Sequence, residues 1–313
     1  MSERCLYCYQ ELNEAEKDFH ARCSKKIFGQ SIPPELPYSE DQMSELAEKV
    51  IKSHVAVTGV QPKLSVGIEK NPDQNAPDRI TIVGVFGDYI LKPPTAHYPN
   101  LPELEDLTMH LASIAGIGTV PHSLIRLQTG QLAYITKRID RHKKQKLHME
   151  DMCQLTERLT EHKYKGSYEQ IAKAVLKYSM NPGLDIINFF EQVVFCFLTG
   201  NNDMHLKNFS LIKDPKLGYN LSPAYDMVAA ALVVEGDTEE LALNLNGKKN
   251  KLKRKDFEAA MAPLDGRIIA NIFLKFQKSI PKLESFINVS FLSAEMRERY
   301  KELLKAKAEQ LEL

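Results

Sequence analysis

The residues of this chain best suited to catalysis are two carboxylates and an amide between positions 203 and 226. Asp203 is followed, after four intervening residues, by Asn208, and Asp226 lies further along, beyond a predicted pair of short strands. A site that transfers a phosphoryl group needs oxygen ligands that link a magnesium ion to the phosphates. We therefore expect Asp203 to orient the proton of an attacking hydroxyl, and Asn208 and Asp226 to hold magnesium.

Two further polar residues lie inside this segment. His205 and Lys207 stand between Asp203 and Asn208 and add positive or hydrogen-bonding character where phosphates would bind. The alternative is that residues 201–203 are only turn residues after a helix, because Asn and Asp favour turns through local hydrogen bonds.

The preceding segment favours the catalytic interpretation. Residues 185–199 form a helix that is apolar on nearly every face, so it must be buried in a sizeable core. Gly200 follows, and glycine commonly ends helices. The polar cluster is thus predicted at the tip of a rigid buried element, where catalytic groups are well positioned.

Length and composition fit a two-lobed enzyme. The chain has 313 residues, more than one core usually supports, and 43% of them are hydrophobic. Lys plus Arg and Asp plus Glu number 41 each, so net charge gives no reason for bulk attraction to nucleic acid or membrane. No apolar run approaches the ~20 residues of a membrane-spanning helix, and the first residues do not resemble a signal peptide. We expect a cytoplasmic protein.

The five cysteines point to metal binding or burial rather than to disulfides in an intracellular chain. A C-x2-C pair and an H-x2-C pair offer the ligands of a tetrahedral, structural zinc site: Cys5, Cys8, His20 and Cys23. Residues 2–27 contain little apolar material to fold without such a metal. The alternative is a loosely ordered tail with incidental thiols. Cys153 and Cys196 lie in apolar helical patterns and are predicted core residues.

The pattern of elements predicts an α+β fold with a sheet-rich first part, a mostly helical second part and a cleft between two lobes. A capping pattern at Ser39 and Gln42 opens a helix to about residue 53, after an extended connector at 31–37. Further helices are expected at 101–115 and from Ser293, with a charged linker at 140–148. The predicted strands lie at 55–57, 64–66, 80–83, 89–91, 123–127, 132–136, 209–212, 219–221 and 241–246.

The predicted domains are a cysteine- and histidine-rich segment at 1–36, a first lobe at 37–140 and a helical second lobe at 141–313. In the first lobe, Lys92 ends a strand and would place its ammonium against phosphates, with helical Glu105 to hold it. A loop between two predicted strands would cover the phosphates: Thr58, Gly59, Val60, Gln61, Pro62 and Lys63. One glycine makes this loop a weak signal. The crossing segment 136–140 would offer backbone groups to a nucleobase and Asp140 to a ribose; its alternative is an exposed charged hinge.

Several motifs together resemble the HipA family of bacterial toxin kinases. They are C-L-Y-C with H-A-R-C, T-G-V-Q-P-K-L-S, Y-I-L-K-P, E-L-E-D-L-T-M-H-L, M-E-D-M-C-Q, N-N-D-M-H-L-K-N-F-S, S-P-A-Y-D-M and L-A-L-N-L-N-G-K-K. The similarity runs through almost the whole chain, and D-x-H-x-K-N with the later Y-D is its most specific part.

The resemblance implies an atypical Ser/Thr protein kinase fold that uses ATP and magnesium. It also implies a DNA-binding antitoxin partner of the HipB type and aminoacyl-tRNA synthetases as the target class. Position by position, it makes Asp203 the catalytic base, Asn208 and Asp226 the magnesium ligands and Lys92 the phosphate-binding lysine. Hinge contacts to the nucleoside would come from Lys137, Ile139 and Asp140.

The sequence departs from the longer family members in two respects. It opens directly on the cysteine-rich segment, so it resembles the short HipT kinases of three-component HipBST systems, in which a separate HipS-like protein supplies the small N-terminal subdomain. The family autophosphorylates a serine in the phosphate-binding loop, whereas Thr58 stands before Gly59 here. Autophosphorylation of Thr58 is therefore an open question; a phosphate there would repel ATP and switch the enzyme off.

The remaining alternatives concern function. The basic stretch 247–255 is expected to be a solvated turn and helix start, or else to lie near DNA when an antitoxin is bound to its operator. A catalytically silent binding or co-repressor module is one competing interpretation, and a small-molecule kinase of the aminoglycoside phosphotransferase type is another.

Overall fold

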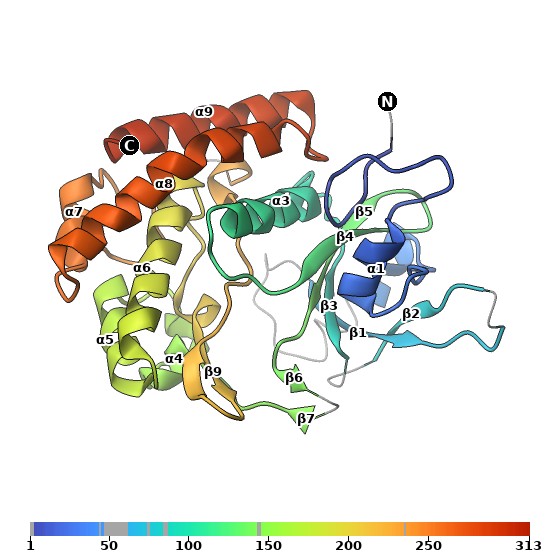
Figure 1. Cartoon of the computed structure of the whole chain (residues 1–313), viewed down its shortest axis with the longest axis horizontal. Helices are drawn as coiled ribbons and strands as arrows, with labels where there is room; N and C mark the ends of the chain where they lie inside the picture. Colours follow the sequence, from blue (N-terminus) through green and yellow to red (C-terminus); the bar gives the residue numbers. More distant parts are fainter. Residues whose placement is uncertain are drawn as a thin grey trace. The chain divides into compact units, whose positions relative to one another are not determined.

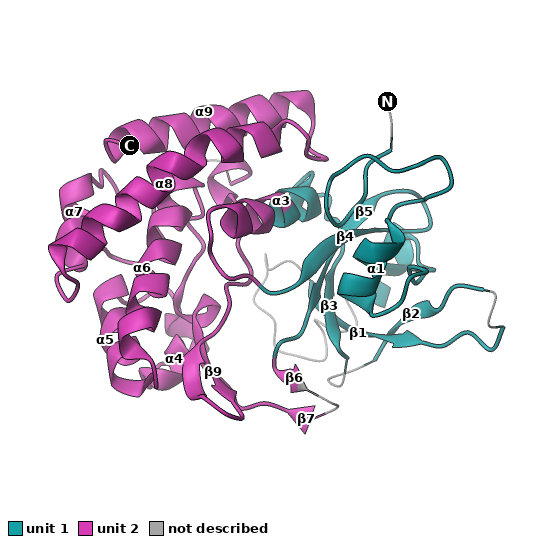
Figure 2. Cartoon of the chain, in the orientation of Figure 1, with its two compact units in different colours: residues 1–106, 120–139 teal, residues 107–119, 140–313 magenta. Residues whose placement is uncertain are grey.

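A computed structural model describes residues 3–43, 45–46, 62–73, 76–83, 87–142, 145–234 and 236–313. Its contacts divide the chain into two compact units, which Figure 2 shows in different colours. Unit 1 comprises Met1–Asp106 and Val120–Ile139, and unit 2 comprises Leu107–Thr119 and Asp140–Leu313. The domain boundaries expected from the sequence stay a prediction.

Unit 1 is built on a five-stranded sheet with the order β2-β1-β3-β5-β4, in which every neighbouring pair is antiparallel. The strands are β1 Leu64–Glu69, β2 Arg79–Ile82, β3 Tyr89–Lys92, β4 His122–Arg126 and β5 Leu132–Lys137. In β1, Leu64 and Val66 are buried while their neighbours are only partly covered, the alternation of a half-buried strand. The predicted antiparallel sheet and hairpin are confirmed.

Helix α1, Ala21–Phe28, packs against this sheet at β3, as Figure 1 shows. The Tyr89 hydroxyl donates to the carbonyl of Ile27 at 3.0 Å, and the rings of Phe28 and Tyr89 lie 6.1 Å apart. The capping box at Ser39 is confirmed, because the Ser39 and Gln42 side chains each bond the other's backbone amide. The predicted strand at 55–57 and the end of the helix that follows Ser39 lie outside the described residues.

Unit 2 is mostly helical. Its helices are α4 Met152–Leu155, α5 Tyr168–Tyr178, α6 Pro182–Leu198, α7 Arg254–Ala260, α8 Gly266–Ile287 and α9 Ala294–Gln310, with short 3-10 turns η2 Thr160–His162, η3 Leu206–Asn208 and η4 Ala230–Leu232. Helix α3, Leu101–Ile114, begins in unit 1 and ends in unit 2. Helices α8 and α9 lie side by side in Figure 1 and α9 also contacts α6, so the terminal helix packs as predicted. Among the described helices, none combines the length and apolar character needed to cross a bilayer.

Unit 2 also contains a small sheet with the order β10-β9-β8. Strands β9, Ser210–Asp214, and β10, Gly218–Leu221, form the predicted pair. Strand β8, Met149–Asp151, was not predicted, because three residues next to a charged stretch carry no readable alternation. Just before it, β6 Arg141–His142 and β7 Gln145–Lys146 form a short hairpin within the predicted linker.

The predicted strand at 241–246 is wrong. Its leucines, Leu241, Leu243 and Leu245, are all buried, which produced the alternating pattern. The backbone makes only isolated bridges, from Asn244 to Ser167 and from Leu245 to Lys248. The apolar period therefore reflects burial of an irregular segment, with a loop and a turn as hydrogen-bonding partners instead of a strand.

Helix α6 ends in a closed left-handed turn. Gly200 has φ +64°, the amide of Asn201 donates to the Cys196 carbonyl at 2.8 Å, and the amide of Gly200 donates to the Phe197 carbonyl at 3.3 Å. These two bonds are the paired bonds of a Schellman motif, which satisfies carbonyls that a helix end leaves open. The chain consequently leaves the core at one defined angle and enters the Asp203 loop.

Replacing Gly200 with alanine should destabilise the protein by at least ~1–2 kcal/mol, since an L-residue at this φ is strained. The new Cβ would also lie 2.6 Å from Leu303 Cδ2 and 3.0 Å from Ala231 Cβ. Urea unfolding measures the change. Gly183→Ala in the same helix is the matched control, because a Cβ there meets nothing within 4 Å and alanine favours helix. Equal stability of the two variants would contradict the interpretation.

Candidate active site

The Asp203 loop folds back on itself through backbone and side-chain bonds. The His205 amide donates to the Asp203 carbonyl at 2.8 Å, and the Asn208 amide donates to the His205 carbonyl at 3.0 Å. The side-chain nitrogen of Asn208 donates to the Asp203 carbonyl at 3.1 Å. This bond engages the side-chain nitrogen of Asn208, so the side-chain oxygen is the atom that can act as a hard acceptor. Asn208 therefore folds back toward Asp203 within the same loop.

Two tyrosines from residues 163–168 support the loop, and sequence reasoning missed both. The Tyr164 hydroxyl donates to Asp203 Oδ1, and its ring meets the His205 ring edge-on at 4.9 Å. The Tyr168 hydroxyl donates to the Met204 carbonyl at 3.1 Å. Burial, and then the bond to Asp203, raise the pKa of Tyr164, so this phenol stays a donor to the carboxylate. Nothing in the local sequence links Tyr164 to a residue so far along the chain.

His205 is buried and neutral at pH 7. Burial lowers its pKa to about 4, although the nearby carboxylates of Asp203 and Asp226 act in the opposite direction. Its Nδ1 is buried and has no hydrogen-bond partner among the described atoms. Of the two characters expected at this position, positive charge or hydrogen bonding, a low pKa leaves His205 with the second at neutral pH.

Lys207 is held by an acid that the sequence did not assign to the site. Its ammonium donates to Asp151 Oδ2 at 2.7 Å, and Asp151 also caps α4 by accepting from the Gln154 amide. The Tyr225 hydroxyl donates to the Lys207 carbonyl at 3.1 Å and lies 2.5 Å from Ser210 Oγ. These contacts tie the loop to β8, β9 and the segment that carries Asp226.

Asp226 adopts the left-handed backbone conformation, with φ +61°. Aspartate tolerates this region better than most residues because its short side chain can bond locally. The segment before it is fixed within unit 2, since the Ala224 amide donates to the Gly118 carbonyl at 2.8 Å. Such backbone strain is common at functional sites, and here it coincides with a predicted magnesium ligand.

In unit 1, Lys92 and Glu105 form the predicted pair. Lys92 Nζ lies 2.5 Å from Glu105 Oε1, and the two side chains are only 5% and 2% exposed. The ammonium also lies 5.4 Å from the centre of the Tyr134 ring. A buried ion pair is costly to desolvate, so its retention fits a functional group better than a stabilising one.

The other predicted nucleotide contacts come from two segments, residues 58–63 and 137–140. Thr58, Gly59, Val60 and Gln61 lie outside the described residues, and Lys63 is exposed just before β1. Lys137 ends β5, where its amide donates to the Pro121 carbonyl at 2.8 Å. The two units meet in sequence between Ile139 and Asp140. The Asp140 carboxylate accepts from Arg141 at 2.6 Å, a contact that a ribose hydroxyl would have to join or replace.

The structure brings the four predicted zinc ligands together. The ligand atoms of Cys5, Cys8, His20 and Cys23 all lie within 4.8 Å of one another. Cys153 and Cys196 are buried elsewhere, as predicted for core residues.

Three of the six basic residues in the stretch 247–255 form ion pairs within unit 2. Lys248 lies 2.8 Å from Asp256, Lys249 lies 2.9 Å from Glu239, and Arg254 lies 2.9 Å from Glu258. The predicted turn and helix start is confirmed, because α7 begins at Arg254.

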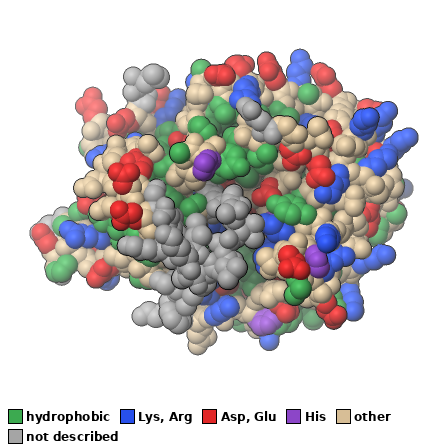
Figure 3. Space-filling view, turned by 180° about the vertical axis from the view of Figure 1, so that it is seen from behind, with side chains coloured by type: hydrophobic (Ala, Val, Ile, Leu, Met, Phe, Trp, Pro, Cys, Tyr) green, Lys and Arg blue, Asp and Glu red, His purple; other side chains and the backbone are tan. Residues whose placement is uncertain are grey.

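On the face in Figure 3, described basic and acidic side chains are interspersed, in keeping with the equal totals of the two charges.

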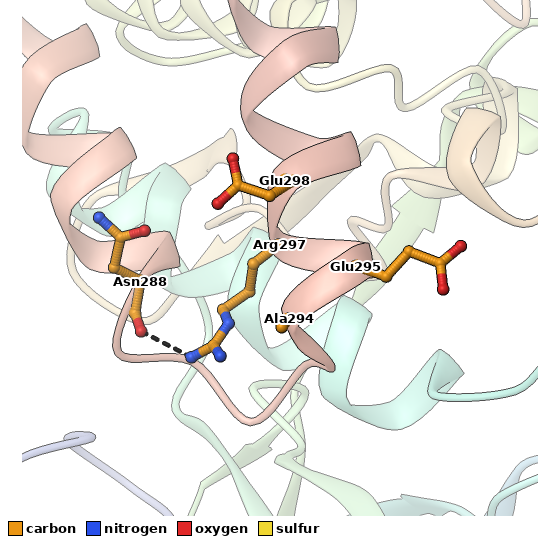
Figure 4. Close-up of a pocket in the computed structure, with 5 residues that line it drawn as sticks. All are labelled: Asn288, Ala294, Glu295, Arg297 and Glu298. Atoms are coloured by element: carbon orange, nitrogen blue, oxygen red, sulfur yellow. Dashed lines mark hydrogen bonds between the residues drawn. The ribbon is translucent and has the colours of Figure 1, made fainter.

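A surface pocket of about 410 Å³ lies at the turn between α8 and α9, as Figure 4 shows. Arg297 donates to the Asn288 carbonyl at 2.8 Å across this turn, and Glu295 and Glu298 line the rest. None of the predicted site residues lines this pocket, and its lining includes two carboxylates, which disfavour phosphates. We assign it no role.

The sequence matches the HipA-like C-terminal domain family over residues 55–302. The chain belongs to this family. A provisionally named kinase of Haemophilus influenzae is 29% identical over 262 residues, which cover 79% of this chain and 73% of that protein. The provisionally named kinase Y4dM of Sinorhizobium fredii is 32% identical over 256 residues, 77% of this chain and 60% of that protein.

Solved structures confirm the predicted α+β, HipA-like kinase fold. HipA of Shewanella oneidensis, solved in complex with HipB and its operator DNA, superposes with a TM-score of 0.69 at 20% identity, covering 88% of this chain and 71% of that one. The proinflammatory kinase CtkA of Helicobacter pylori gives a TM-score of 0.54 at 16% identity, covering 78% and 93%. At these identities the similarity establishes the fold alone.

Lys92→Met should destabilise the protein by roughly 3 kcal/mol or more, because it removes the ammonium that neutralises the buried Glu105 carboxylate. The double variant Lys92→Met/Glu105→Leu removes both charges and should return to within ~1 kcal/mol of the native stability. Urea unfolding compares the three proteins. A single variant as stable as the native chain would show that the pair is not the buried interaction described above.

Stability should fall as the pH decreases from about 6.5 to about 4, by roughly 3 kcal/mol from His205 alone. In this window the unfolded state protonates the histidine and the folded state does not, so protons favour unfolding. Urea unfolding of the native chain and His205→Asn at several pH values measures the difference. The control is His97→Asn, which replaces an exposed histidine and should leave the pH dependence of stability unchanged. A native-like pH dependence in His205→Asn would contradict the assignment to His205.

Proposed function

We propose that this chain is an ATP- and magnesium-dependent Ser/Thr protein kinase, the toxin of a HipA-type toxin-antitoxin system. The observation that carries the proposal is the folded-back loop after α6, in which Asn208 bonds the Asp203 carbonyl and Tyr164 bonds the Asp203 carboxylate. Family membership, the kinase names of the relatives and the kinase-like fold support the same reaction class.

In the proposed reaction, Asp203 orients the acceptor hydroxyl and accepts its proton as the γ-phosphoryl group of ATP is transferred. The Tyr164 phenol donates to one oxygen of that carboxylate and holds the group in place. The second oxygen is then the one that meets the hydroxyl. Buried, neutral His205 offers Nδ1 as an additional hydrogen-bonding atom beside the carboxylate.

Asn208 and Asp226 would hold magnesium, and their donors fit it, because magnesium prefers hard oxygen ligands. The side-chain nitrogen of Asn208 is engaged by the Asp203 carbonyl, which leaves the oxygen for a cation. Magnesium bound there would neutralise phosphate charge. Lys92, oriented by Glu105, would supply the ammonium for the phosphates. The loop 58–61 with Lys63 would cover them, and Lys137, Ile139 and Asp140 would contact the nucleoside.

The proposed partners rest on the similarity to the family. The HipA structure of Shewanella oneidensis is a complex with HipB and operator DNA, and we propose a HipB-type antitoxin for this chain, with DNA contacted only through it. A separate HipS-like protein and a target among the aminoacyl-tRNA synthetases belong to the same proposal. A cytoplasmic location fits all of these partners. Autophosphorylation at Thr58 is left open by the proposal.

Asp203→Asn should lower phosphoryl transfer by about 10²–10⁴-fold, the usual contribution of a positioned acid or base. Radiolabelled ATP and magnesium are incubated with the purified chain and a whole-cell extract, and label on protein is quantified. Phosphoamino acid analysis then distinguishes serine and threonine from other acceptors. The control is Asp265→Asn, which changes the same charge at the cap of α8 and keeps a capping side chain.

The outcomes separate the alternatives. Label on protein that disappears in Asp203→Asn and persists in Asp265→Asn supports the proposed kinase. Nucleotide binding without label from any variant would instead indicate a silent binding or co-repressor module. Label that appears only on small molecules would indicate a kinase of the aminoglycoside phosphotransferase type.

A further inference from the structure

The N-terminal segment presents four metal-ligating side chains in one cluster. Cys8 Sγ lies 3.4 Å and Cys23 Sγ 3.7 Å from Nδ1 of His20, and all four ligand atoms lie within 4.8 Å of one another. In a tetrahedral zinc site with ordinary Zn–S and Zn–N bonds, a sulfur and a nitrogen ligand are separated by about 3.6 Å. The two sulfur–nitrogen separations at His20 therefore match those of a tetrahedral zinc site.

The outer contacts of His20 orient it toward a metal. Its Nε2 lies 3.0 Å from the Glu11 carbonyl, a contact in which the ring nitrogen donates. This bond places the proton on Nε2 and leaves Nδ1, the atom that faces the thiols, with a lone pair. Metal-binding histidines commonly use such a bond to fix their tautomer and ring orientation.

The backbone supplies the ligands from two rigid pieces. Cys5 and Cys8 lie in a tight turn closed by the Tyr9 amide, which donates to the Cys5 carbonyl at 2.9 Å, and Tyr9 takes φ +62°. His20 is the residue before α1, and Cys23 lies in its first turn. Two of the ligands thus come from a turn and the other two from the start of a helix.

The same turn contacts the core of unit 1. The Leu6 carbonyl accepts from the Ser123 hydroxyl at 3.1 Å and from the Leu124 amide at 3.3 Å, both in β4. The buried Tyr9 hydroxyl donates to Asp106 Oδ2 at 2.8 Å. His122 Nδ1 lies 2.7 Å from the other oxygen of Asp106.

Asp106 directly follows Glu105, the partner of Lys92. The His122 ring stacks on the Tyr134 ring at 6.0 Å, and Lys92 lies over the same Tyr134 ring. Contacts therefore run without interruption from the cysteine turn to both members of the Lys92–Glu105 pair, and every side chain in this path is buried.

We propose that Cys5, Cys8, His20 and Cys23 bind one structural zinc ion, and that the metal-held turn fixes the Lys92–Glu105 pair through Tyr9 and Asp106. Zinc fits because three thiolates and one imidazole are the soft and borderline ligands of closed structural sites, which keep no open position for catalysis. The metal site does not depend on the proposed kinase function. Only the expected effect of the metal-held turn on nucleotide binding rests on that function.

Metal analysis tests the site. The full-length chain, loaded with zinc and desalted, should hold about one equivalent, and the double variant Cys8→Ser/Cys23→Ser should hold less than about a fifth of that. Cys153→Ser is the matched control, because it removes a buried thiol outside the cluster and should keep the metal. Less than half an equivalent in the native chain, or a full equivalent in the double variant, would overturn the site.

Cobalt gives a measurement that does not depend on a folded variant. Replacing zinc by Co²⁺ in the native chain should produce the intense visible bands of a tetrahedral ion and the charge-transfer absorption of thiolate ligands. The weak spectrum of an octahedral ion with oxygen ligands would contradict the assignment.

Hydrogen exchange tests whether the metal-held turn positions the Lys92–Glu105 pair. Removal of the metal with a strong chelator should speed exchange in residues 101–106 and 122–126, with little change in α6. Tyr9→Phe keeps all four ligands and should keep the zinc, yet speed exchange at 101–106. Unchanged exchange there after metal loss, or in Tyr9→Phe, would show that the turn does not position the pair.

The consequence for the proposed kinase is measured separately. Tyr9→Phe should weaken MgATP binding by about fivefold to tenfold, as expected for one lost buried hydrogen bond. An affinity equal to that of the native chain would contradict the coupling. A native chain that binds no nucleotide, while the metal and exchange results hold, would count against the proposed function and leave the zinc site standing.

Discussion

The left-handed turn at Gly200 is the constraint on which the candidate site depends. Helix α6 is buried along nearly its whole length, so its axis is fixed by the core, and the two bonds that close its end leave the chain a single exit. The direction in which the chain leaves the helix therefore sets the positions of Asp203 and Asn208. Tyr164 and Asp151, from other parts of unit 2, then lock the loop at Asp203 and Lys207. A catalytic loop that is ordered before substrate arrives loses less entropy when the reaction begins.

Features that depend on local sequence were predictable. The apolar period located α6, the capping residues located the helix after Ser39, and the turn residues located the β4–β5 hairpin. The Lys92–Glu105 pair was also predicted, from the order of a strand-end lysine and a helical acid along the chain. The failures share one cause. Tyr164, Asp151 and strand β8 matter through contacts with residues far along the chain, and the leucines of 241–246 satisfy a strand pattern while packing in an irregular segment. Periodicity reports burial, whereas the backbone partner that decides strand or loop lies elsewhere in the sequence.

Unit 1 concentrates buried polar groups around one short stretch of α3. Glu105 and Asp106 point to different partners, Lys92 for the first and Tyr9 with His122 for the second, and all five side chains are shielded from water. Each charge or dipole is compensated by a neighbour, which avoids the large penalty of an unpaired buried group. The arrangement also makes the network mutually dependent, since moving one member leaves the others unsatisfied. Such a network therefore fixes the positions of its side chains more than it adds to the stability of the fold.

The backbone at Asp226 has a further consequence, for the divergence of the family. At φ +61° most side chains are strained, and glycine, asparagine and aspartate are the residues that tolerate the conformation. A descendant that no longer uses the proposed magnesium ligand while keeping the fold could exchange Asp226 for asparagine or glycine, but a larger or branched residue would also cost it stability. Loss of catalysis by drift should accordingly leave a narrow and recognisable set of residues at this position, distinct from the wider set allowed at Asp203.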